Sequence, residues 1–192
     1  MGREFELKYR ATPEQIETIR SAYGCFETIS METTYYDTTD GLFSDLRWTL
    51  RQRMENGRSV CTLKTPLPDG SRGEWEVEKD SIDESIPELC KLGAPEILPR
   101  LVEDGLVPSC GARFTRLAKT LTDAYCTLEL ALDQGVLLGG GKELPFAEVE
   151  VEYKSGSEEA AVAFAQALAW KFRMEPEPKS KIARAQALAG NF

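Results

Sequence analysis

Acidic side chains recur at every second position along several short segments of this chain. Glu4 and Glu6 stand this way near the start, and Glu148, Glu150 and Glu152 near the end. Successive side chains of a β-strand point to opposite faces, so each set would lie on one face of a strand. Carboxylate oxygens are the donors that magnesium and manganese prefer, so such a face could hold a divalent cation.

Basic residues follow the same spacing on other segments. Arg51 and Arg53 share one strand face, for example. Guanidinium groups bind phosphate oxygens through two parallel hydrogen bonds, and lysine ammonium groups act as point charges. A carboxylate patch beside a basic patch therefore predicts a site for a metal-chelated oligophosphate. The basic residues in this set are Lys8, Arg51, Arg53, Lys64, Arg72 and Arg116.

For any single strand, the plainer interpretation is a solvated outer face, as in many half-open sheets. The set of strands favours a shared site instead. Like charges two residues apart lie within roughly 7 Å of one another and repel once they are partly desolvated. We therefore expect the acidic residues to destabilise one another when no metal is bound. Glu74 is expected to pair with basic side chains rather than with a metal.

The same alternation defines the elements that must position these residues. Strands are predicted for 5–10, 32–37, 46–54, 58–64, 73–79, 114–121, 124–132, 135–138 and 147–153, with turns at 56–57 and 134–135. Helices are predicted after residues 12 and 157, over 181–189, and as one or two short pieces within 83–111. We expect an α+β fold, a single domain over 1–192, whose sheet closes into a barrel with its charged faces inward.

Composition excludes several classes of protein. The 192 residues contain no histidine, which removes histidine bases and histidine metal ligands. The net charge of -9 argues against general nucleic-acid binding, which depends on neutralising phosphates. No segment approaches the ~20 apolar residues of a membrane span. The five scattered cysteines form no C-x-x-C pair and predict reduced thiols in a cytoplasmic protein.

In their order along the chain, the motifs resemble those of the CYTH superfamily, the triphosphate tunnel metalloenzymes. The similarity begins at an E-x-E-x-K signature and covers nearly the whole chain. The chain looks most similar to bacterial stand-alone members and to the N-terminal domain of bacterial inorganic triphosphatases. Ala185 stands where the family often has glycine. The matching segments include Glu4-Phe5-Glu6-Leu7-Lys8, Leu50-Arg51-Gln52-Arg53, Thr62-Leu63-Lys64, Glu148-Val149-Glu150-Val151-Glu152 and Ser180-Lys181-Ile182-Ala183-Arg184.

The resemblance implies a closed eight-stranded antiparallel β-barrel with helices packed outside, which binds a triphosphate together with two divalent ions, Mg²⁺ or Mn²⁺. The metal ligands that it implies are Glu4, Glu6, Glu148, Glu150 and Glu152. The substrate-binding residues that we expect are Lys8, Arg51, Arg53, Lys64, Arg72, Arg116, Lys181 and Arg184.

The leading functional hypothesis is metal-dependent hydrolysis of inorganic triphosphate to pyrophosphate and phosphate. Glu150 or Glu152 would accept the proton of the attacking water, and Lys8 would act on the phosphate chain. Two alternatives keep the same site: a class IV-type adenylyl cyclase, or a thiamine or nucleoside triphosphatase. A third is a non-catalytic module that binds polyphosphate. We expect no nucleic-acid or membrane partner, and a monomer or homodimer.

Overall fold

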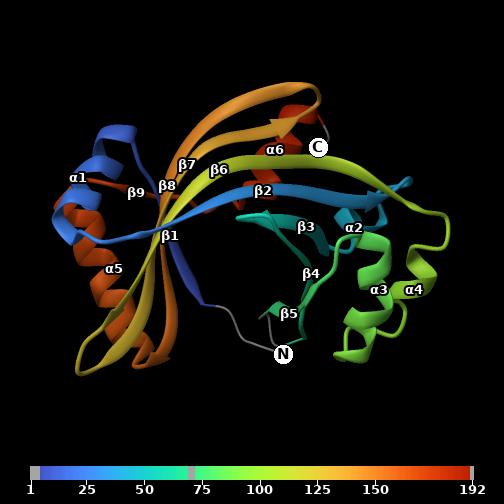
Figure 1. Cartoon of the computed structure of the whole chain (residues 1–192), viewed down its shortest axis with the longest axis horizontal. Coiled ribbons are helices and arrows are strands. Elements are labelled where there is room, and N and C mark those ends of the chain that lie inside the picture. Colours follow the sequence, from blue (N-terminus) through green and yellow to red (C-terminus); the bar gives the residue numbers. More distant parts are fainter. Residues whose placement is uncertain (1–4, 69–71, 191–192) are drawn as a thin grey trace.

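A computed structural model describes residues 5–68 and 72–190 of the chain, so Glu4 lies outside the described residues. Nine strands form one antiparallel sheet in the order β5-β4-β3-β2-β6-β7-β8-β1-β9 (Figure 1). Their bounds are β1 (Glu6–Arg10), β2 (Glu27–Thr38), β3 (Thr49–Glu55), β4 (Arg58–Pro66), β5 (Arg72–Glu78), β6 (Leu106–Thr122), β7 (Cys126–Gly139), β8 (Lys142–Gly156) and β9 (Glu175–Pro176).

Six helices accompany the sheet in the described part of the chain. The first begins at the expected capping box, in which Thr12 and Gln15 exchange hydrogen bonds around Pro13. Within the ranges 5–68 and 72–190, none of the helices has the length and apolar character needed to cross a membrane. The helices are α1 (Pro13–Tyr23), α2 (Leu42–Asp45), α3 (Ile82–Lys91), α4 (Leu98–Leu101), α5 (Glu158–Phe172) and α6 (Lys181–Ala189).

The sheet is strongly curved but open, so the predicted closed eight-stranded barrel is wrong. Its two edges are β5 and β9, and they do not pair with each other in the described residues. Closure would need the outer edge of β1. There, Tyr9 and Arg10 already pair with β9, and the backbone oxygen of Lys8 accepts a hydrogen bond from the Glu177 amide at 2.9 Å. Pro176 has no N–H group, so β9 is itself a poor template for another strand.

The period-two pattern gives the sheet two different faces, as the sequence predicts. On the outer face, Val149 and Val151 of β8 are buried against the helices α1 and α5. Further along the sheet, Leu50 and Leu63 are buried with α3 in a second apolar cluster. The charged neighbours of these residues therefore point to the concave face, because adjacent side chains of a strand alternate. The apolar contacts outside thus fix the direction of the charged side chains inside.

Helix α6 lies on the concave face, where it contacts β6, β7 and β8 (Figure 1). Its Ala185 is fully buried in an apolar cluster with Phe114 and Phe146 of the sheet. The helix approaches the β7–β8 turn so closely that a Cβ atom on Gly139 would lie 2.0 Å from the Ala185 carbonyl oxygen. The absence of a side chain at Gly139 of β7 therefore permits the close contact with Ala185 of α6.

The predicted turn at 134–135 is also wrong, because β7 continues without a break to Gly139. Gly135 lies inside strand β7 rather than in a turn. A Cβ atom there would lie 2.1 Å from the carbonyl oxygen of Arg113 on β6. A glycine inside a strand can mark such a close backbone approach, which sequence alone does not distinguish from a turn.

We expect Gly139→Ala to displace α6. The added methyl group meets a backbone oxygen rather than a flexible side chain, and overpacking of this kind costs about 1–3 kcal/mol of unfolding free energy. Denaturant unfolding should show the loss, and amide hydrogen exchange should rise within 181–189.

Gly141→Ala is the control in the same turn. Among the described residues other than its chain neighbours, no atom lies within 4 Å of its added Cβ, so its φ of +73° strains the backbone there without a clash against α6. It should leave exchange in α6 at the wild-type rate. Equal exchange in the two variants would contradict the tight contact at Gly139.

Candidate active site

A pocket of about 460 Å³ opens on the concave face. Strands β1 to β8 and helix α6 all contribute side chains to its walls, so residues far apart in the sequence meet there. The expected site residues that line it are Glu6, Lys8, Arg51, Arg53, Lys64, Arg72, Arg116, Glu150, Glu152 and Lys181.

Two of the expected residues stand behind the pocket wall. Glu148 is fully buried, and Arg184 reaches it from α6 without lining the cavity. Five further charged side chains line the pocket but were not among the expected metal-binding or substrate-binding residues. Glu55 continues the alternation of Arg51 and Arg53, and Lys154 continues that of the last acidic strand, so the same period-two count would have found these two. The five are Glu55, Glu74, Glu76, Glu129 and Lys154.

One wall of the pocket is basic. Arg51 and Arg53 point inward from β3, and Lys64 joins them from β4. Glu74 lies between two of these cations, with its Oε1 3.3 Å from Lys64 Nζ and 3.9 Å from Arg51 Nη2. Arg53 is paired with Glu55 through Nη2.

The Nε atom of Arg53 adds a sign of an anion site. It is buried and has no hydrogen-bond partner in the described part of the chain. Burial and the neighbouring Arg51 guanidinium lower the pKa of Arg53. Two like charges held this close favour a bound anion, because an anion would neutralise both and satisfy the donor.

The opposite wall carries a row of three carboxylates. Glu152 on β8 stands directly opposite Glu6 on β1 and Glu129 on β7. Directly opposed residues have Cβ atoms about 5 Å apart, so the three side chains are neighbours on one face. Two lysines offset part of their charge: Lys8 lies 3.1 Å from Glu6, and Lys154 lies 2.8 Å from Glu152. This row of oxygen donors fits a divalent cation such as Mg²⁺ or Mn²⁺.

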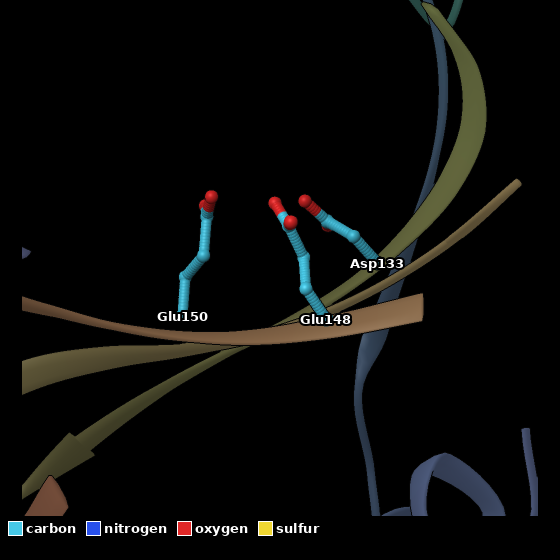
Figure 2. Close-up of side chains that lie close together, drawn as sticks. All are labelled: Asp133, Glu148 and Glu150. Atoms are coloured by element: carbon cyan, nitrogen blue, oxygen red, sulfur yellow. The ribbon is translucent and has the colours of Figure 1, made fainter. Parts of the chain in front are cut away.

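A second group of carboxylates lies deeper. Asp133, Glu148 and Glu150 point the same way from β7 and β8, and their oxygens lie within 4.8 Å of one another (Figure 2). The Lys181 ammonium group contacts all three, at 2.8 Å from both Asp133 and Glu150. The place that a cation would take among these carboxylates is therefore held by the protein's own lysine.

Two arginines complete this buried network. Arg116 donates two parallel hydrogen bonds to Asp133, from Nε at 2.8 Å and from Nη2 at 2.7 Å, and it also contacts Glu150. Arg184 donates to Glu148. Three basic side chains thus balance three acidic ones, and the expected repulsion among metal-free carboxylates is offset in this group.

The pKa shifts follow from these contacts. Burial raises the pKa of Glu148, although Lys181 opposes the shift. For Glu150, burial acts in the same direction, but Lys181 and Arg116 outweigh it and hold the pKa well below its usual range. The pKa of Lys181 is raised, because the attraction of its three carboxylate partners outweighs the opposite effect of burial. Glu150 and Lys181 are consequently charged at neutral pH.

We expect Asp133→Asn to destabilise the protein strongly. It removes one charge from a buried network and leaves Arg116 and Lys181 under-compensated, and breaking a buried pair in this way costs about 3–5 kcal/mol. Denaturant unfolding would measure the change.

Glu143→Gln gives the comparison, because its 2.7 Å contact with Arg113 joins two side chains that are more than half exposed. Its cost should stay within about 0.5 kcal/mol. Similar losses in both variants would show that the buried network does not carry this stability.

Comparison with known proteins places the chain in a family. The CYTH domain model matches residues 2–185. An inorganic triphosphatase of Haemophilus influenzae is 27% identical over 164 residues, which cover 82% of this chain and 47% of that protein. The chain thus spans about half the length of this curated relative.

Solved structures share the fold. A candidate adenylate cyclase of Bacillus halodurans superposes with a TM-score of 0.69 at 22% identity, over 96% of this chain and 98% of the other. A candidate adenylyl cyclase of Hippeastrum, whose structure is described as revealing a dominant triphosphatase activity, gives 0.67 at 21% identity, over 96% and 95%. The family model spans nearly the whole chain and agrees with the sequence motifs, and the chain therefore belongs to the CYTH domain family.

Proposed function

We propose that this chain hydrolyses inorganic triphosphate to pyrophosphate and phosphate with the help of a bound divalent metal. The observation that carries the proposal is one pocket with a basic wall and an opposed row of three carboxylates. A metal-chelated oligophosphate presents both kinds of group at once, anionic oxygens for the basic wall and a cation for the carboxylates.

The distribution of cations supports a chain of phosphates rather than a single one. Arg51 and Arg53 come from β3, Arg116 from β6 and Lys181 from α6, so cationic side chains reach the cavity from three different elements. These side chains would hold the phosphate oxygens and neutralise the charge that develops when a terminal phosphoryl group leaves. Lys8, beside the carboxylate row, would contact the same phosphate chain.

The carboxylate row Glu6, Glu152 and Glu129 is the set that we propose for the metal. A bound divalent cation there would supply Lewis-acid activation of a phosphoryl oxygen or of a water molecule. The role of Glu4, which is outside the described residues, stays a prediction from the sequence.

Of the two expected proton acceptors, Glu152 is the better one. Glu150 is held by Lys181 and Arg116, and its lowered pKa makes it a weak base at neutral pH. Glu152 contacts Lys154 and lines the pocket. A carboxylate has two oxygens, so Glu152 can ligate through one of them and accept a proton through the other.

The relatives point in the same direction. The Haemophilus protein carries the name inorganic triphosphatase, and the Hippeastrum structure is described by a dominant triphosphatase activity. The likeness to the first extends over about half its length, and that to the second is one of fold.

The test is phosphate release from tripolyphosphate, ATP and thiamine triphosphate under one metal at a time. We expect tripolyphosphate to be the preferred substrate with Mg²⁺ or Mn²⁺, and no release without a divalent ion. Absence of release with both metals, from neutral to alkaline pH, would end the proposal.

A second substrate class has one observation in its favour. Apolar side chains also line the pocket. Two of them, Ile29 and Ile182, are only partly buried and could face an organic group attached to the triphosphate. Preferred turnover of thiamine triphosphate or ATP, or cyclic AMP as the main product, would replace inorganic triphosphate as the substrate.

We expect Arg53→Gln to lower kcat/KM for tripolyphosphate at least about tenfold, because it removes a charged donor that we place on the phosphates. Melting temperature should change little, since Arg53 lies at the pocket and contributes no apolar packing to the core.

Arg58→Gln is the control on the same hairpin, because the Arg58–Glu78 pair is largely exposed. Its kcat/KM should equal that of the wild type. Equal losses in the two variants would remove Arg53 from the substrate site.

A further inference from the structure

The register of β1 and β8 separates Glu148 from the carboxylate row. Glu6 stands opposite Glu152, whereas Glu148 stands opposite Arg10. Four residues along a strand span about 13 Å, so Glu148 begins far from the atoms that flank Glu152. Its side chain is also fully buried and does not line the pocket.

Both carboxylate oxygens of Glu148 are engaged by the same helix. Lys181 contacts Oε1 and Arg184 contacts Oε2, and these two residues lie three positions apart on α6. Residues at this spacing occupy neighbouring places on one helix face, so a single glutamate can hold both. Arg184 has a further partner in Glu177 at 3.7 Å, which extends the ion pairs toward β9.

We propose that Glu148 is a positioning residue that clamps α6 and fixes Lys181 at the pocket wall, and that it is not a metal ligand. Lys181 is the member of the clamp that lines the pocket. Its ammonium group is also held by Asp133 and Glu150 and lies 5.1 Å from the centre of the Phe114 ring. Glu148 therefore acts on a phosphate through Lys181.

The close contact at Gly139 strengthens this view of the helix. The apolar side of α6 packs against the β7–β8 turn, and the charged side is held by Glu148. Fixed at both places, α6 presents Lys181 to the pocket in one position. The assignment rests on the proposed function, because it takes tripolyphosphate as the ligand of the basic wall.

Two binding measurements on the whole chain separate the two roles without turnover. Manganese affinity is measured without substrate, from the electron paramagnetic resonance signal of free Mn²⁺. Tripolyphosphate affinity is measured by calorimetry in the presence of a chelator, so that no metal-dependent hydrolysis occurs. The variants are Glu148→Gln, Lys181→Met, their combination, and Glu6→Gln as the reference for a metal ligand.

We expect Glu148→Gln to leave manganese affinity within about twofold of the wild type, whereas Glu6→Gln weakens it at least about tenfold. Glu148→Gln should also weaken tripolyphosphate binding several-fold, although it removes a negative charge. Glu55→Gln, which removes a negative charge from the pocket beside Arg53, should bind tripolyphosphate as tightly as the wild type or more tightly.

A double-mutant cycle tests whether Glu148 acts through Lys181. In the Lys181→Met background, Glu148→Gln should have no further effect on tripolyphosphate affinity. A merely structural role would lower the melting temperature without this non-additive pattern. If Glu148→Gln does not fold, Arg184→Gln loosens the same clamp from the other oxygen and should show the same two binding results.

The proposal is overturned if Glu148→Gln weakens manganese binding as much as Glu6→Gln, or if its effect on tripolyphosphate adds fully to that of Lys181→Met. These failures differ from failure of the proposed function. A chain that shows the expected cycle but releases no phosphate would refute hydrolysis alone, and a chain that releases phosphate with an additive cycle would refute the role of Glu148 alone.

Discussion

The concave face depends on one interaction, the buried set of ion pairs in which Lys181 lies among Asp133, Glu148 and Glu150. Each acidic member of this set would be costly to bury alone, and so would each basic one. Together they balance, and because the acids belong to the sheet while Lys181 and Arg184 belong to α6, the balance also attaches the helix. The end of the pocket at α6 is therefore held by charge as well as by apolar contact.

This arrangement works because apolar contacts on the outer face of the sheet fix the register of β8. Val149 and Val151 pack outward, so Glu148 and Glu150 have no alternative to the concave side. A one-residue slip of β8 would bury carboxylates against α5 and expose valines in the pocket. The apolar core on the outer face thus disfavours a register slip of β8. The buried ion pairs on the concave face disfavour the same slip, because it would separate their partners.

Period-two alternation is a local property, so the sequence predicted which charged residues share a face. Arg51 with Arg53, and Glu150 with Glu152, reach the same pocket because each pair lies two residues apart on one strand. The family also followed from ordered motifs. The sequence pattern did not show that the sheet stays open, because closure depends on what pairs with the free edges of its outermost strands. Two residues, Glu175 and Pro176, occupy the edge of β1, and their sequence has none of the alternation that identifies a strand.

The sequence pattern also did not predict which charged side chains pair within the site, because the pairing depends on distances between the strands and α6. Counting like charges along β8 led to an expectation of repulsion, whereas Lys181, thirty-one positions after Glu150, cancels much of it.

The same internal ion pairs affect which ligand the pocket can bind. On the basic wall, Lys64 already has Glu74 as a partner and Arg53 has Glu55, so an incoming anion must compete with these carboxylates. A single phosphate group would have to displace such partners for few contacts. A chain of phosphates that carries a divalent cation can replace these partners on both walls. Its anionic oxygens bind the basic side chains in place of the carboxylates, and its cation binds the carboxylates in place of the basic side chains.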